Sequence, residues 1–165
     1  MSTTNIFVAD PYDKNHIELF KNFEKENTKV KKVSPLFEKI ITTSDKKTYL
    51  KNKTIDNNIN EVLFIKGKNN IKDFCYITGE KDIKTCKLYF PDIDPKNKNR
   101  LIVKAATDYS INYLQMETAF VMTDESNKAL IKNLENLSYE SIGNDDNTVT
   151  YMIEREKIIN KERII

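Results

Sequence analysis

The chain has 165 residues, of which 39% are hydrophobic and 10% aromatic, and this composition fits one globular domain spanning 1–165. Its 27 basic and 25 acidic residues are interspersed and leave a formal net charge of only +2, so the charge pattern predicts no nucleic-acid partner. No apolar run approaches the ~20 residues of a membrane span, and the N-terminus lacks the core of a signal peptide. We therefore expect a cytoplasmic protein without a membrane partner, and the many Lys, Asn and Ile residues favour a bacterial, AT-rich genome.

The first third of the chain predicts one short strand followed by helices. Residues 5–9 form the strand, Asp10-Pro11 ends it, and apolar residues spaced for one helical face follow over 15–26. Ser34-Pro35 predicts a second helix, with Ser34 as N-cap and Pro at the first helical position. The polar segment 45–58 has weak helical spacing and is predicted as a third helix.

The rest of the chain predicts strands with a helical crossover. The apolar runs 61–66, 71–78 and 83–90 are separated by short loops, 67–70 and 79–82, which favour antiparallel hairpins. A helix over 101–113 then leads to a strand over 115–123, which a right-handed crossover places parallel to 83–90. A helix over 126–137 and a hairpin of 139–142 with 148–153 follow. The fold class is therefore α/β, with a mixed sheet of about six or seven strands and about four flanking helices.

The segment 84–113 is the first candidate for a ligand site. An apolar strand enters a polar loop, and the loop opens into a helix whose apolar residues share one face. Free N–H groups and the helix dipole converge on such a loop, which makes it a common anion-binding device.

This order of elements, together with the segment FVMTDESNKALIKNLENLSYESIG at 120–143, resembles the GNAT superfamily of acyl-CoA-dependent N-acyltransferases. In that family the segment is the penultimate strand, a helix that starts with Asn, and the last hairpin. The resemblance implies acetyl-CoA or another acyl-CoA as cofactor. It also implies transfer of the acyl group to an amine acceptor, either a small molecule or a peptide.

The chain departs from the family pattern at two places. In the family, an Arg/Gln-x-x-Gly-x-Gly/Ala loop binds the cofactor pyrophosphate. Aligned with this pattern, the chain has Lys98 at the basic position and Leu101 and Val103 at the two small positions. The family's Tyr general acid falls on Leu134, which cannot transfer a proton. Two interpretations stay open: a divergent N-acyltransferase, and a binding or regulatory module of the same fold without catalysis.

The resemblance implies cofactor contacts from Phe90, at the end of the strand, and from Lys98, Asn99 and Arg100 in the loop. Asn127, at the start of the later helix, is the fifth candidate. The basic side chains suit phosphate, but two aspartates in the same loop offset much of their charge. Asn99 is equally suited to cap the central helix.

Candidates for proton transfer are fewer. The resemblance implies that Glu117 lies on a strand facing the cleft and acts as general base, although alternation alone does not fix its face. Tyr139, with Tyr109 and Tyr151 as alternatives, could supply the missing acid, and packing in the core is the competing interpretation of all three. His16, the single histidine, is read as a surface residue. With one His and two Cys, neither a Cys/His metal site nor a serine triad is expected.

The two cysteines test the strand register. A turn at 79–82 pairs Thr78 with Ile83 and therefore places Cys75 directly opposite Cys86. In a reducing compartment we expect two free thiols. The C-terminal tail from residue 155 onward alternates charges with isoleucines. It packs either on the domain or on a partner, and a homodimer is one form of the second alternative.

Overall fold

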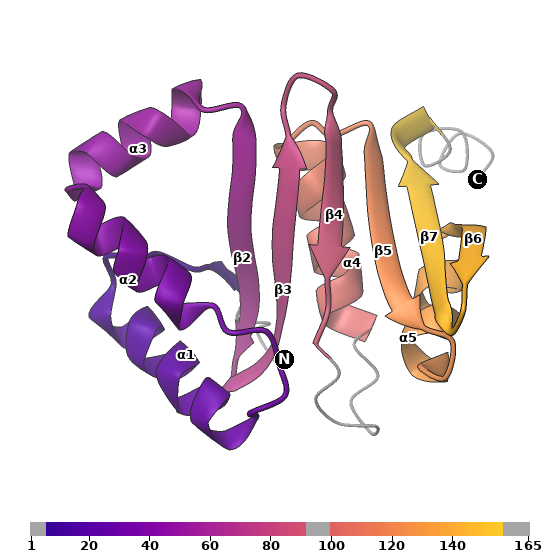
Figure 1. Ribbon diagram of the computed structural model, residues 1–165, viewed down its shortest axis with the longest axis horizontal. Coiled ribbons are helices and arrows are strands. Elements are labelled where there is room, and N and C mark those ends of the chain that lie inside the picture. Colours follow the sequence, from indigo (N-terminus) through magenta and orange to yellow (C-terminus); the bar gives the residue numbers. More distant parts are fainter. Residues whose placement is uncertain (1–5, 92–99, 157–165) are drawn as a thin grey trace, which may run out of the picture.

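The computed structural model describes residues 6–91 and 100–156, and of Arg100 only the backbone. This part of the chain forms seven strands and five α-helices, the fourth of which continues as a turn of π-helix, η1 (Figure 1). The strands are β1 (Ile6–Val8), β2 (Asn58–Lys66), β3 (Ile71–Glu80), β4 (Thr85–Tyr89), β5 (Thr118–Asp124), β6 (Glu140–Asp145) and β7 (Thr148–Glu154). The helices are α1 (Lys14–Glu26), α2 (Ser34–Thr43), α3 (Lys46–Ile55), α4 (Arg100–Asp108) with η1 (Tyr109–Tyr113), and α5 (Lys128–Asn136).

All seven strands belong to one sheet, in the order β1-β2-β3-β4-β5-β7-β6. Neighbouring strands are antiparallel except β4 and β5, which are parallel and are joined through α4. This confirms the predicted mixed α/β sheet with hairpins on the N-terminal side and one helical crossover. None of the described helices has the length and apolar character needed to cross a membrane.

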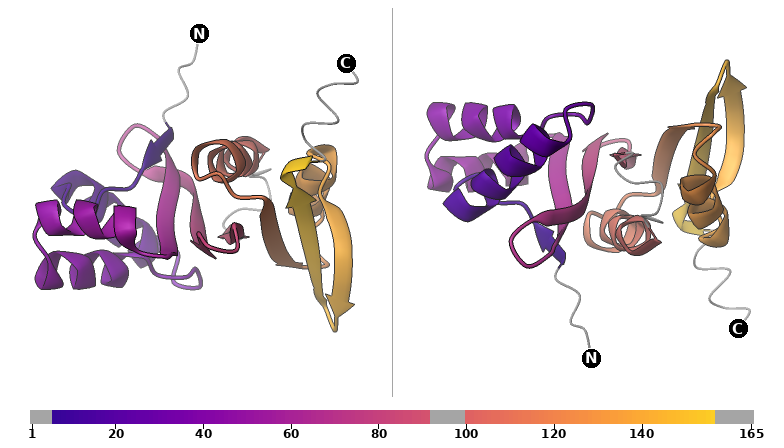
Figure 2. Two further views of the ribbon diagram at one scale, coloured as in Figure 1. Left: turned by 90° about the horizontal axis from the view of Figure 1, so that it is seen from above. Right: turned by 90° about the horizontal axis from the view of Figure 1, so that it is seen from below.

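Helices cover both faces of the sheet. On one face α1 and α2 pack on β1–β3, where the ring of Phe20 contacts Phe37, Phe64 and Phe74 edge to face. On the other face α4, η1 and α5 cover the larger core, which reaches from β2 to β7. Figure 2 shows α1–α3 and α4 on opposite sides of the strands. We call these two sides the α2 face and the α4 face.

The start of α2 differs from the prediction. Val33, and not Ser34, is the N-cap, and it offers no side-chain cap. The buried Glu24 carboxylate of α1 replaces that cap, because its Oε2 accepts the N–H groups of Val33 at 2.9 Å and Ser34 at 3.0 Å. A negative charge at the positive end of a helix dipole is stabilising. The Ser34 hydroxyl donates to the other carboxylate oxygen at 2.5 Å.

The predicted opposition of Cys75 and Cys86 is wrong. β3 continues past Gly79, so Gly79 and not Cys75 pairs with Cys86, and the turn ends at Lys84, whose φ is 51°. A Cβ on Gly79 would lie 2.5 Å from the carbonyl oxygen of Thr85. The glycine is therefore needed for the close approach of two strands and not for a turn. Both thiols are free and buried, and burial raises the pKa of Cys86 to about 11.

The last hairpin is also tighter than the predicted loop over 143–147. β6 extends to Asp145, with a bulge between Ser141 and Gly143, and only Asp146 and Asn147 form the turn. Asp146 has a φ of 56°, a conformation that Asp adopts more readily than most residues. The prediction for the C-terminal tail beyond residue 156 lies outside the described residues.

Candidate functional site

The parallel strands β4 and β5 separate at their C-terminal ends. The two strands pair from Thr85 with Thr118 as far as Leu88 with Val121. Beyond Val121, β5 continues and pairs only with its other neighbour, β7, up to Asp124 (Figure 1). The direction of the Phe90 backbone follows from the register. Ala9 N–H donates to Val62 C=O, so the backbone of Val62 points to β1; its partner Tyr76 on β3 then points to β4, and Tyr89 points back to β3. The backbone groups of the next residue, Phe90, therefore point toward β5. Among the described residues β4 no longer pairs with β5 at this level, so a ligand can bind the backbone groups of Phe90.

Helix α4 starts one short connection after this opening, at Arg100. The first N–H groups of a helix have no partner within the helix and carry its positive dipole end. Leu101 is 45% exposed, whereas Ile102 and Val103 are fully buried in the core. Of the two branched residues that replace the family's small ones, only Leu101 therefore lies on the open side of α4. Lys98 and Asn99 lie outside the described residues, and so does the side chain of Arg100.

The candidate acid Tyr139 is part of a buried chain of hydrogen bonds. The Thr107 hydroxyl donates to the Val103 carbonyl at 2.7 Å, and the phenol oxygen of Tyr139 lies 2.6 Å from the same hydroxyl oxygen. Because Thr107 has already used its one hydrogen, Tyr139 must be the donor. Burial raises the pKa of Tyr139 well above its usual value, so the phenol is neutral at physiological pH. Leu134 is fully buried nearby in the same core.

The remaining cofactor candidates lie close to α4 and α5. The Phe90 side chain is in the core of the α4 face, so only its backbone faces the opening. Asn127 is the N-cap of α5, and its Oδ1 accepts the N–H of Leu130 at 3.3 Å. The predicted helix start is therefore confirmed, while its contact with a cofactor stays a prediction.

Glu117 lies at the other end of the sheet. It precedes the first residue of β5, its side chain is 63% exposed, and its carboxylate lies 3.8 Å from the ammonium of Lys84. The opening begins beyond Val121, so the expected place of Glu117 in the cleft is not what the structure shows. Strand alternation could not reveal this, because alternation gives the face on which a side chain lies and not the end of the strand at which the sheet opens.

The other predicted roles are resolved by packing. Tyr151 is buried on β7, and Tyr109 lies in η1 at the far end of α4. His16, predicted as a surface residue, is partly buried: its side chain is 14% exposed, its Nδ1 accepts the N–H of Asp10 at 3.0 Å, and its ring packs edge to face on Phe64. No group of His, Cys, Asp and Glu among the described residues could hold a metal ion.

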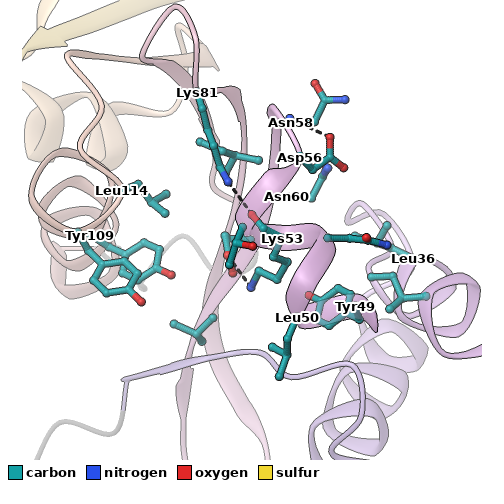
Figure 3. Close-up of a pocket in the computed structure, with 17 residues that line it drawn as sticks. Leu36, Tyr49, Leu50, Lys53, Asp56, Asn58, Asn60, Lys81, Tyr109 and Leu114 are labelled. Atoms are coloured by element: carbon teal, nitrogen blue, oxygen red, sulfur yellow. Dashed lines mark hydrogen bonds and ion pairs between the residues drawn. The ribbon is translucent and has the colours of Figure 1, made fainter. Parts of the chain in front are cut away.

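Sequence reasoning missed a pocket that lies beside the N-terminal half of β2 (Figure 3). Its centre holds an ion pair, in which the ammonium of Lys53 on α3 lies 2.7 Å from Glu61 on β2. The one sequence signal was a glutamate at the start of the apolar run EVLFIK, which alone predicts no partner.

No family model and no curated protein matches the sequence. Solved structures do match the fold. A spermidine N-acetyltransferase SpeG mutant from Vibrio cholerae has a TM-score of 0.64 at 14% identity, covering 96% of this chain and 99% of its own. The Campylobacter jejuni N-acetyltransferase PseH, solved in complex with acetyl coenzyme A, has a TM-score of 0.60 at 14% identity over 92% and 99%. A dodecameric form of the Vibrio cholerae enzyme has a TM-score of 0.65 at 13% identity over 96% and 97%. The chain therefore has the GNAT fold of these N-acetyltransferases.

Proposed function

We propose that this GNAT-fold chain binds an acyl-CoA at the opening between β4 and β5 and transfers the acyl group to an amine. The observation that carries the proposal is the end of β4–β5 pairing at Leu88 and Val121, after which the chain leads to the N-terminus of α4. The two structural neighbours named above as N-acetyltransferases share this fold. Fold alone does not determine activity, so the residues of the opening must support it.

Backbone groups carry the binding in this proposal. The first N–H groups of α4 suit a pyrophosphate, as helix N-termini do in general. Lys98, Asn99 and Arg100 flank that end in sequence, and Asn127 starts the neighbouring α5. Acyl-CoA supplies an activated thioester, and the N–H of Phe90 is directed to polarise the thioester carbonyl at the unpaired side of β4.

Proton transfer is the weaker half of the site. Leu134 stands at the family's acid position, and the Tyr139 proton is bonded to Thr107 in the core. Solvent must then protonate the leaving thiolate unless Tyr139 rotates away from Thr107. We therefore expect slow transfer, since a positioned acid typically contributes about 10²–10⁴ in rate. The same two residues favour a second candidate function, a module that binds acyl-CoA without turnover. The class of the acceptor, small molecule or peptide, stays a prediction. The formation of a homodimer is also a prediction.

The decisive experiment measures free CoA thiol released from acetyl-CoA with a panel of amines, including spermidine, an amino sugar and a peptide N-terminus. We expect release that depends on one class of amine. Leu101→Asp places a carboxylate beside the pyrophosphate position and should weaken use of acetyl-CoA, although Asp in a first helical turn favours the helix. Ile142→Asp is the matched control, since Ile142 is 50% exposed on the distant edge strand β6 and Leu101 is 45% exposed. Binding without amine-dependent release would support the second candidate, and equal effects of the two variants would contradict the site.

A further inference from the structure

The pocket beside β2 has a volume of about 890 Å³ and lies where a further strand of the sheet would run. Its walls come from α2, α3, β1, β2, η1 and the β3–β4 turn. In Figure 3, Tyr109 and Leu114 lie on one side of Lys53, whereas Tyr49, Leu50 and Leu36 lie on the other.

Among the described residues no strand pairs with the outer edge of β2 at this pocket, although its other edge pairs with β3. β1 pairs with β2 from Ile6 to Val8, and Ala9 N–H still donates to Val62 C=O at 2.8 Å. In this register the next residue that should bond β2 is Pro11, opposite Asn60, and proline has no N–H. The chain turns away there. Among the described residues no backbone group pairs with the N–H or C=O of Asn60 on this edge.

The pocket extends over both faces of the sheet edge. Ile59, Tyr109 and Leu114 belong to the core of the α4 face, whereas Leu36 belongs to that of the α2 face. Each half exposes a large apolar side chain, with Tyr113 in η1 72% exposed and Leu50 in α3 51% exposed. An extended chain directs alternate side chains to opposite faces of a sheet. A bound strand would therefore cover both halves at once, which a compact ligand on one face would not.

The ion pair defines what such a strand must carry. The Glu61 side chain is only 9% exposed, and Lys53 reaches it from α3 while lying 5.5 Å from the ring centre of Tyr49. α3 is held here by polar contacts, among them the Lys81 ammonium on the Lys53 carbonyl, and none of its ten residues is buried. Lys53 thus occupies the middle of the pocket. A strand that displaces it must supply another cation, because a buried carboxylate without one is strongly destabilising.

We propose that this pocket binds an extended peptide as an additional strand. The peptide pairs with both backbone groups of Asn60 and with the C=O of Asn58, whose N–H donates to Asp56 Oδ1 at 3.4 Å. It runs antiparallel to β2 and in line with β1. A basic side chain on the α4 face takes the place of Lys53 at Glu61, and apolar side chains on the α2 face contact Leu36 and Leu50. This mode of recognition is β-augmentation, in which backbone hydrogen bonds give affinity and alternate side chains give specificity.

The test uses the full chain and the blocked peptide acetyl-Val-Lys-Val-Tyr-amide, labelled for fluorescence anisotropy. Its two valine N–H groups face β2 when its lysine faces Glu61. We expect saturable binding that weakens at least about tenfold when both valines are N-methylated, because two hydrogen bonds are lost. N-methylation of the lysine and tyrosine, whose N–H groups face away from β2, is the matched control and should have little effect.

Protein variants test the same geometry from the other side. Asn60→Pro removes the outward N–H, which edge strands tolerate, and should abolish binding while circular dichroism stays unchanged. Lys53→Met leaves Glu61 without its cation, so it should lower the free energy of unfolding and, in protein that circular dichroism shows to be folded, tighten binding of the peptide lysine. Lys51→Met, at an exposed residue on the same helix, should do neither. The proposal is overturned if wild type and Lys53→Met both fail to bind, or if the two N-methylated peptides bind equally. It is also overturned if Asn60→Pro instead dissociates a dimer, since the edge would then bind a second copy.

Discussion

Replacing Thr107 with valine should destabilise the protein more than replacing Tyr139 with phenylalanine. Tyr139→Phe removes one buried hydrogen bond, worth about 0.5–1.5 kcal/mol, and leaves the Thr107 hydroxyl donating to the Val103 carbonyl. Thr107→Val deprives a phenol that is only 3% exposed of its acceptor, which costs about 1–3 kcal/mol. The double variant makes the contact apolar on both sides and should be more stable than Thr107→Val alone.

Urea unfolding at fixed pH, with the free energy of unfolding extrapolated to water, measures all four members of this cycle. In thermal unfolding each kcal/mol corresponds to about 2–4 °C for a chain of this size. Thr150→Val, at a half-buried position on β7, controls for the general effect of valine in place of threonine. A larger loss for Tyr139→Phe than for Thr107→Val would refute the assigned donor direction. A loss of acyl transfer by about 10²-fold or more in Tyr139→Phe would show that the phenol acts as the acid.

Three further predictions concern register, binding and pH. Gly79→Ala should lower the free energy of unfolding, measured in urea, by about 1–3 kcal/mol, because the added Cβ would clash with the backbone of β4. Gly143→Ala is the control and should have little effect, since a Cβ there has no atom within 4 Å. Equal effects of the two variants would contradict the β3–β4 register. Leu101→Gly should strengthen CoA binding measured by calorimetry, because Leu101 is exposed at the start of α4. Val103→Gly should mainly lower the free energy of unfolding, because Val103 is fully buried. Tighter CoA binding in Val103→Gly and not in Leu101→Gly would contradict the assigned positions of the two side chains. At the start of α3 the N–H of Thr48 donates to the Asp45 carboxylate at 2.7 Å and lowers its pKa, so this cap is complete above the ordinary pKa of Asp and is lost as pH falls through the lowered pKa. Asp45→Asn should remove this pH dependence from the amide NMR shift of Thr48. A titration of that shift that persists in the variant would contradict the assignment.

The order of strands and helices could be predicted because each element has a periodic apolar face. The crossover from 83–90 to 115–123 followed from a single helix between two apolar runs, and the structure confirms it. Registers could not be predicted in the same way. Gly79 is an ordinary turn signal in sequence, but here it permits close strand contact, which depends on the position of Cys86 on the next strand.

The candidate site was predicted by segment and less well by side chain. Of the segment 84–113, β4 runs to the point where β4–β5 pairing ends and α4 follows it in the chain, whereas the loop between them lies outside the described residues. The buried state of Tyr139 depends on Thr107, which lies 32 residues earlier in the chain, and no spacing rule links the two. The cap that Glu24 provides for α2 is likewise a contact between different elements. The free edge at Asn60 required the register that aligns it with Pro11.

Calorimetric titration of the full chain with acetyl-CoA tests the central claim most directly. We predict saturable binding of one acetyl-CoA per chain that weakens in Leu101→Asp and is unchanged in Ile142→Asp. Binding that is absent at millimolar acetyl-CoA, in a chain that is folded by circular dichroism, would contradict the claim that the opening between β4 and β5 is an acyl-CoA site.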